Sequence, residues 1–320
     1  MNKDRYKIYE HSTHTELIPI FNYNKNESKL KYTHVMFFFA GFNEYASKYI
    51  YLFKNFLEDM QNISIKVIIP NLPTYNTSDL IKYSENPEFN QRFPTIRSWF
   101  RKTIKKFDNK ILNYNNTQEY KNKYYEFLDT LESAIDYNTT EFVKKYIIEE
   151  AYNLNSSEKI ILAAFSQGGI YLLNSILNNL NIKVCFIALF KTNLVTYVNP
   201  MFYYNEKFIN DNQFNKFKCN YNLLLDKNLN KTDLKNFLNK NFLDNHIYYY
   251  VSRYDKIVTF QLSLDSYNVF NNEFKINSSK KSNLFFSCDN SNKHEVDSNC
   301  LRELAKLFNT YILNNLLVKF

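Results

Sequence analysis

One serine in this chain stands where a reactive hydroxyl would be exposed. Ser166 follows an apolar run, Ile160–Phe165, and precedes Gly168 and Gly169, which are two of only three glycines in 320 residues. A strand that turns sharply into a helix needs small residues beside the turn, and such a turn lifts the serine hydroxyl clear of the backbone. This hydroxyl can attack a carbonyl carbon once a base removes its proton. The same residues also fit a serine–glycine helix start without chemistry.

The base that such a serine needs is most often a histidine, which follows the serine and its acid along the chain in this arrangement. Only His246 and His294 follow Ser166. His246 begins an apolar run and is typical of a strand entry. His294 lies in a polar loop between the apolar run Leu284–Cys288 and a final amphipathic segment. This position favours His294 as the base over an ordinary exposed histidine.

The carboxylate that orients the histidine is expected after the preceding strand. Asp255 is the first acid beyond the apolar run Ile247–Val251. Asp265 lies too far into the next segment, and Asp244 precedes the strand. Asp255 is therefore the candidate, although a turn or helix-capping aspartate would have the same sequence position.

The elements that must position these residues alternate between strand and helix patterns. Helical spacing of apolar residues is found over Ser47–Met60, Ile170–Leu180 and residues 301–312. Short continuous apolar runs are typical of strands buried on both faces of a parallel sheet. These runs are His34–Phe39, Ile65–Ile69, Lys159–Ala164, Val184–Leu189, Ile247–Val251 and Leu284–Cys288. The alternation predicts an α/β fold, with a mostly parallel central sheet and helices on both faces.

Two Asn- and Lys-rich stretches interrupt this alternation, near residues 103–150 and 200–245. Neither follows a Pro/Gly linker, and neither has a core of its own. The sequence therefore predicts one domain over residues 1–320 that carries two insertions.

Composition excludes several classes of protein. A hydrophobic content of 45% excludes disorder as the main character, and three glycines cannot supply a glycine-rich phosphate loop. The four cysteines form no C-x-x-C pair, so no metal site is predicted. No apolar stretch is long enough to span a membrane and no secretory signal precedes the first strand, so a cytoplasmic location is expected. The net charge of +8 is spread along the chain, and the hypothesis of a nucleic-acid binder rests on this charge alone.

Six segments resemble motifs of the acyl-protein thioesterase / phospholipase–carboxylesterase family, in the same order over roughly residues 30–315. Residues 164–169 resemble its G-F-S-Q-G-G elbow, and residues 40–44 its H-G-L-G-D oxyanion loop. Residues 68–73, 98–100, 252–258 and 293–296 resemble its P-x-x-P, S-W-F-D, acid-loop and histidine-loop motifs. Residues that differ from the family pattern, mostly where it has glycine, are Ala40, Asn43, Ala164, Ser252 and Lys293.

This resemblance implies an α/β-hydrolase fold and a two-step acyl transfer. Ser166 would be the nucleophile, His294 the base and Asp255 the orienting acid, and the backbone N–H groups of Phe42 and Gln167 would form the oxyanion hole. Neither a cofactor nor a metal is implied.

The expected substrates are long-chain acyl thioesters or esters, above all the S-palmitoyl groups of proteins. A carboxylesterase or lysophospholipase acting on small esters or lysolipids is the close alternative, and a catalytically inactive binding protein of the same fold is the second. The expected partners are S-acylated proteins or lysolipids, with transient contact to an anionic membrane surface and none to nucleic acid.

Overall fold

The computed structural model describes most of the chain between residues 6 and 317. The described ranges are 6–20, 32–60, 63–79, 87–100, 135–177, 182–192, 245–258 and 284–317, with a few further positions between residues 180 and 271.

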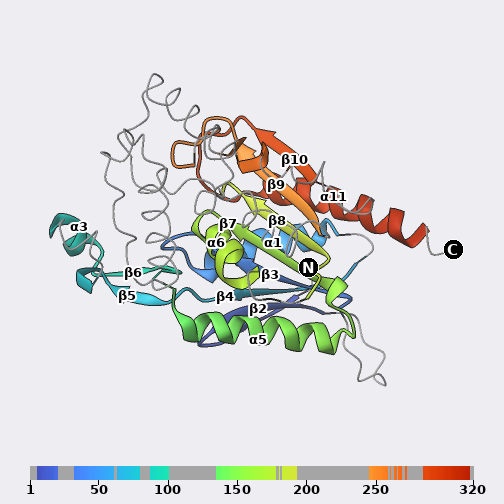
Figure 1. The fold of residues 1–320 in the computed structure, drawn as a ribbon, viewed down its shortest axis with the longest axis horizontal. Coiled ribbons are helices and arrows are strands. Elements are labelled where there is room, and N and C mark those ends of the chain that lie inside the picture. The colour runs from blue at the N-terminus through green and yellow to red at the C-terminus, as the bar shows by residue number, and fades with distance from the viewer. Residues whose placement is uncertain are drawn as a thin grey trace, which may run out of the picture.

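A twisted sheet of eight strands runs through the centre of this structure (Figure 1). Its spatial order is β1-β2-β4-β3-β7-β8-β9-β10, and the six strands from β4 to β10 are parallel. β1 and β2 extend the sheet as an antiparallel hairpin beside β4. The bounds are β1 (Tyr6–Glu10), β2 (His14–Pro19), β3 (His34–Phe39), β4 (Ile65–Pro70), β7 (Ile160–Phe165), β8 (Phe186–Phe190), β9 (His246–Ser252) and β10 (Leu284–Asp289).

The phenylalanines of β3 show how the sheet is covered on both faces. Successive side chains of a strand point to opposite faces. Phe37 contacts Tyr146 of helix α5 (Tyr137–Asn153) on one face, with 5.6 Å between ring centroids. Phe38 contacts Phe53 of helix α1 (Ala46–Glu58) on the other, at 4.9 Å. The continuous apolar run therefore serves two layers of helix.

The described α-helices differ in length. The helices are α1 (Ala46–Glu58), α3 (Pro87–Arg92), α5 (Tyr137–Asn153), α6 (Gln167–Tyr171) and α11 (Ser298–Leu317). α11 lies beside α1 and packs Phe308 against Phe186 of β8, at 4.7 Å. α5 covers the opposite face (Figure 1). It starts after Asp136, whose side chain accepts a hydrogen bond from Thr139 N–H (2.8 Å).

Short elements complete the fold. β5 (Thr74–Asn76) and β6 (Thr95–Arg97) pair as a separate two-stranded antiparallel sheet. One-turn 3₁₀ helices lie at Thr77–Asp79 and Ser157–Lys159, and a π-helical turn at Leu172–Ile176 continues α6.

The predicted α/β architecture is confirmed, and each of the six predicted strands is present within about two residues. The β1–β2 hairpin and the β5–β6 pair were not predicted. The insertion expected over residues 103–150 is described only from residue 135, where it leads into α5, and the one over 200–245 only at Asn245. The rest of both insertions lies outside the described residues, so they stay predictions.

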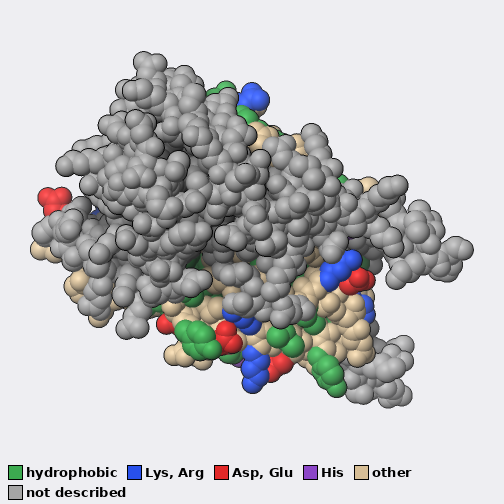
Figure 2. Space-filling model, viewed as in Figure 1, with side chains coloured by type: hydrophobic (Ala, Val, Ile, Leu, Met, Phe, Trp, Pro, Cys, Tyr) green, Lys and Arg blue, Asp and Glu red, His purple; other side chains and the backbone are tan. Residues whose placement is uncertain are grey.

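The outer face of α5 carries charges of both signs beside exposed apolar side chains, in the lower part of Figure 2. Lys144 pairs with Glu141 and Lys145 with Glu149 along this helix. On this helix the basic residues are thus balanced by acids. No helix in the described part of the chain is long and apolar enough to cross a membrane.

Candidate active site

Ser166 occupies a strained turn between β7 and α6. Its backbone has φ 50° and ψ −122°, a conformation that residues with a side chain rarely adopt. Such a conformation costs of the order of 1–3 kcal/mol and persists only where its surroundings enforce it. Ser166 N–H donates to Phe190 O (3.1 Å), and Ser166 O accepts from Thr192 Oγ1 (2.7 Å) and Gly169 N–H (3.0 Å). The end of β8 therefore holds the turn in place.

The two glycines after Ser166 are required by close packing. A Cβ atom on Gly168 would lie 2.2 Å from Phe39 O and 2.5 Å from Ala40 O, which are backbone atoms that cannot move aside. A Cβ atom on Gly169 would lie 2.4 Å from Thr192 Oγ1. In a chain with three glycines, these two permit α6 to start against the neighbouring strands.

Asp255 lies three residues beyond the end of β9 and is 4% exposed. Its Oδ1 accepts hydrogen bonds from Ile257 N–H (2.8 Å) and Val258 N–H (3.1 Å). These bonds fix the loop and leave Oδ2 directed at His294 Nδ1, 2.6 Å away. Because an ionised carboxylate only accepts hydrogen bonds, this contact favours the histidine tautomer with its proton on Nδ1.

His294 joins the serine and the aspartate. Its Nε2 lies 2.7 Å from Ser166 Oγ, so hydroxyl, imidazole and carboxylate form one continuous chain. The ring of Phe165 packs on the imidazole at 4.9 Å between centroids. Both contacts that the sequence predicts for His294 are present, whereas His246 starts β9 at the other end of the strand that precedes Asp255.

The histidine loop is held by a lysine that sequence reasoning missed. Lys191 follows β8 with φ 45°, is 1% exposed, and donates from Nζ to Lys293 O (2.8 Å). Arg253 N–H also donates to Asp289 O (2.9 Å), which ties the acid loop to the histidine loop. No spacing in the sequence signals Lys191, because its partner lies 102 positions later.

The residues proposed for the oxyanion hole lie on two adjoining segments. Gln167 is the first residue of α6, and its side-chain oxygen accepts from Ser98 Oγ (3.2 Å) and Trp99 N–H (3.1 Å). Phe42 lies in the loop after β3, beside Asn43, whose N–H donates to Arg97 O (2.8 Å). The segment from Arg97 to Trp99 thus contacts Gln167 and the residue that follows Phe42.

The loop that contains Phe42 is also braced by an acid. Glu44 accepts hydrogen bonds from Gly41 N–H (3.1 Å), from the Tyr49 hydroxyl and from Lys48. Trp99 Nε1 donates to Ala40 O (2.8 Å) from the other side. The loop therefore keeps its shape although Ala40 and Asn43 stand where the family pattern has histidine and glycine; Asn43 itself has φ 56°.

Two groups of potential metal ligands occur among the described residues, and neither includes a member of the Ser166–His294–Asp255 chain. In the group Asp289, Asp297 and Cys300, burial raises the pKa of the Cys300 thiol to about 12, and Asp289 accepts from the Tyr250 hydroxyl (3.0 Å). Without a metal this thiol stays protonated, so an ion would have to displace its proton. The other group is His11, His14 and Glu16.

No protein-family model matches the chain, and no curated protein matches it. Solved structures do. SOBER1 from Arabidopsis thaliana is similar at a TM-score of 0.51 and 10% sequence identity, over 87% of this chain and 99% of that one. Acyl-protein thioesterase 2 from Zea mays aligns at a TM-score of 0.47 and 12% identity, over 94% and 99%.

The central sheet and this structural similarity define the fold as that of the α/β-hydrolases. In this fold, ligands bind outside the carboxyl ends of the parallel strands. Ser166, Asp255 and His294 follow β7, β9 and β10 at that edge. The fold therefore places the three side chains where such proteins hold their ligands.

Proposed function

We propose that this protein is a serine hydrolase that cleaves long-chain acyl thioesters or esters, with the S-palmitoyl groups of proteins as its first substrate. The observation that carries the proposal is the continuous contact from Ser166 Oγ to His294 Nε2 (2.7 Å) and from His294 Nδ1 to Asp255 Oδ2 (2.6 Å). A hydroxyl, a base and an orienting acid in this order are the groups that acyl transfer needs.

The first half of the reaction would form an acyl-enzyme. Ser166 Oγ attacks the substrate carbonyl carbon as its proton passes to His294 Nε2, and the N–H groups of Phe42 and Gln167 stabilise the oxyanion. Asp255, which keeps the Nδ1 proton in place, stabilises the imidazolium. The carbon–sulfur or carbon–oxygen bond then breaks, and the leaving group takes the proton from Nε2.

The second half would release the acid. A water molecule gives a proton to His294 Nε2 and attacks the acyl carbon. The second tetrahedral species collapses, Ser166 regains its proton, and the fatty acid leaves. No oxidant, reductant or further group enters this balance.

The preference for a long acyl chain rests on the six family-like motifs. Each methylene that leaves water for an apolar groove contributes about 0.8 kcal/mol. The expected consequence is a kcat/KM that rises with chain length until the groove is full.

A chain-length series tests this preference. Acyl thioesters from acetyl to palmitoyl, with lysophosphatidylcholine beside them, would be assayed on the full chain and on Ser166→Ala. Turnover that rises with length and vanishes in the variant supports the proposal. Turnover confined to acetyl esters would make the protein a small-ester carboxylesterase, and no turnover of any ester would favour a binding protein.

A further inference from the structure

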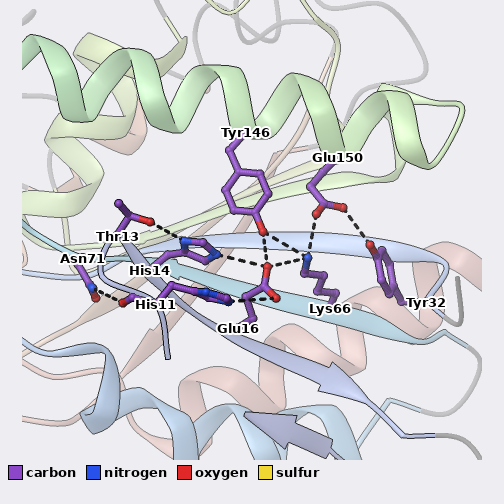
Figure 3. Close-up of polar contacts among 9 residues, drawn as sticks. All are labelled: His11, Thr13, His14, Glu16, Tyr32, Lys66, Asn71, Tyr146 and Glu150. Atoms are coloured by element: carbon purple, nitrogen blue, oxygen red, sulfur yellow. Dashed lines mark hydrogen bonds and ion pairs between the residues drawn. The ribbon is translucent and has the colours of Figure 1, made fainter. Parts of the chain in front are cut away.

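The tight turn between β1 and β2 brings two histidines together (Figure 3). His11 N–H donates to His14 O (2.8 Å), and the two imidazole rings stack at 4.4 Å between centroids. Asn71, which follows β4, donates from Nδ2 to His11 O (3.3 Å) and Ser12 O (3.1 Å). The backbone of the turn is thereby fixed.

A carboxylate faces both imidazoles. Glu16 lies two residues after His14 on β2 and therefore on the same face of the strand. Its Oε1 lies 3.4 Å from His14 Nε2, and its Oε2 lies 3.8 Å from His11 Nε2. One ligand atom from each of the three residues falls within 4.8 Å of the others. Ligand atoms about 2.0–2.2 Å from a tetrahedral zinc ion lie about 3.3–3.6 Å apart, so the three side chains must draw closer and the stacked imidazoles must turn toward a common point.

The charges around Glu16 favour a further cation. Lys66 Nζ lies 2.7 Å from Glu16 Oε1 and 2.8 Å from Glu150 Oε1, so one ammonium group serves two buried carboxylates. Tyr32 and Tyr146 donate hydroxyl hydrogen bonds to Glu150 and to Glu16 Oε1 and add no charge. The lysine and Tyr146 occupy Oε1, whereas Oε2 lies on the side of His11 (Figure 3). The two carboxylates and the one ammonium group thus leave one excess negative charge in this cluster.

The surroundings of the histidines also suit a metal ion. Thr13 Oγ1 lies 2.9 Å from His14 Nδ1, an outer contact that leaves Nε2 for coordination. The His11 side chain is 46% exposed and that of His14 is 11% exposed. An ion therefore has a path from solvent past His11 to a nearly buried pair of ligands.

We propose that His11 Nε2, His14 Nε2 and Glu16 Oε2 bind a zinc ion, with water in the fourth position. Two imidazoles and one carboxylate suit zinc rather than calcium or magnesium, which take oxygen ligands. The ion would hold the β1–β2 turn to the sheet. Strands β4 and β3 separate β2 from β7, so this site is distinct from Ser166.

Zinc titration of the full chain tests the site. The protein is stripped with a chelator and dialysed, and zinc binding is followed by calorimetry, with the visible absorption of cobalt(II) as a report of tetrahedral coordination. One tight site is expected. Losing an outer contact already weakens metal binding by about 10–100-fold, so Thr13→Val should fall in that range, and His11→Ala should lose at least as much.

The matched control is His34→Gln, which removes one histidine outside the cluster and should leave zinc affinity unchanged. Zinc should also raise the unfolding temperature of the wild type and not that of His11→Ala. Because His11 is exposed, this variant should fold normally, which circular dichroism would check. Absence of a one-to-one site in the wild type overturns the proposal. So does a zinc affinity that is equal in the wild type and His11→Ala.

Discussion

Two polar networks lie against the same sheet and use their side chains differently. In the candidate active site, Ser166, His294 and Asp255 come from loops after the strands, and Ser166 is held in a backbone conformation that costs free energy. The second network, here called the Lys66 cluster, consists of Glu16, Tyr32, Lys66, Tyr146 and Glu150. It lies between the β2–β4 strands and α5.

The Lys66 cluster is built so that its protons stay where they are. Burial raises the pKa of Glu16, but hydrogen bonds from His14, Lys66 and Tyr146 outweigh it and hold that pKa well below its usual range. Burial and the adjacent carboxylates raise the pKa of the Tyr32 and Tyr146 hydroxyls. At the candidate active site, one Asp255 oxygen fixes the loop, while the other contacts His294 Nδ1, and His294 Nε2 faces Ser166 Oγ. Substitutions should therefore change the rate in one network and the stability in the other.

The largest expected effect belongs to Asp255→Asn. An amide that favours the wrong histidine tautomer lowers kcat by about 10⁴-fold in a Ser-His-Asp site, and the same direction and rough size are expected here. Thioester hydrolysis measures it. Asp59→Asn changes an exposed carboxylate at the end of α1 and should leave the rate unchanged. Equal rates in the two variants would contradict the role of Asp255.

Lys66→Met should lower the stability of the protein and leave its rate of thioester hydrolysis unchanged. Removal of one partner from a buried ion pair costs about 3–5 kcal/mol, and here two carboxylates lose their common cation. Urea unfolding in the presence of a chelator measures the loss, and activity per folded molecule should be retained.

The control for Lys66→Met is Lys145→Met. The Lys145 side chain is 78% exposed and pairs with an exposed Glu149, so its loss should cost less than about 1 kcal/mol. If both lysine variants unfold at the same urea concentration, the Lys66 cluster is not a source of stability.

The smallest effect concerns His34 and His246, each of which is partly buried and lies near a lysine. Burial and Lys159 lower the pKa of His34 to about 4, and burial and Lys183 lower that of His246 to about 4. In the unfolded chain these histidines have a pKa near 6.5, so as the pH falls they bind protons in the unfolded state before they do so in the folded state. Their contribution to stability is therefore lost as pH falls from 6.5 to 4.

The double variant His34→Gln/His246→Gln isolates the contribution of the two histidines to the pH dependence of stability. The carboxylates titrate in both the variant and the wild type, so their effect cancels in the comparison. The free energy of unfolding should fall less in the double variant than in the wild type between pH 7 and pH 5. An identical fall would show that the two histidines have ordinary pKa values in the folded state.

The sequence predicts the parallel strands well because their apolar runs are continuous. It also predicts that Ser166, Asp255 and His294 lie at one edge of the sheet, because each follows such a run. It fails at β2, where buried His14 and Glu16 replace the expected apolar residues. The reason for these polar residues is Lys66 within β4 and Glu150 on α5, which lie 84 positions apart. The zinc site proposed at His11 contains no cysteine, so the spacing of the cysteines carries no information about it.

The central claim is that Ser166 is a nucleophile activated by His294, and a fluorophosphonate probe tests it most directly. The full chain and Ser166→Ala would be treated with the probe and analysed by intact mass and peptide mapping. We expect one adduct per wild-type chain, located on Ser166, and none on the folded variant. An unmodified wild-type protein, or equal labelling of Ser166→Ala, would contradict the account.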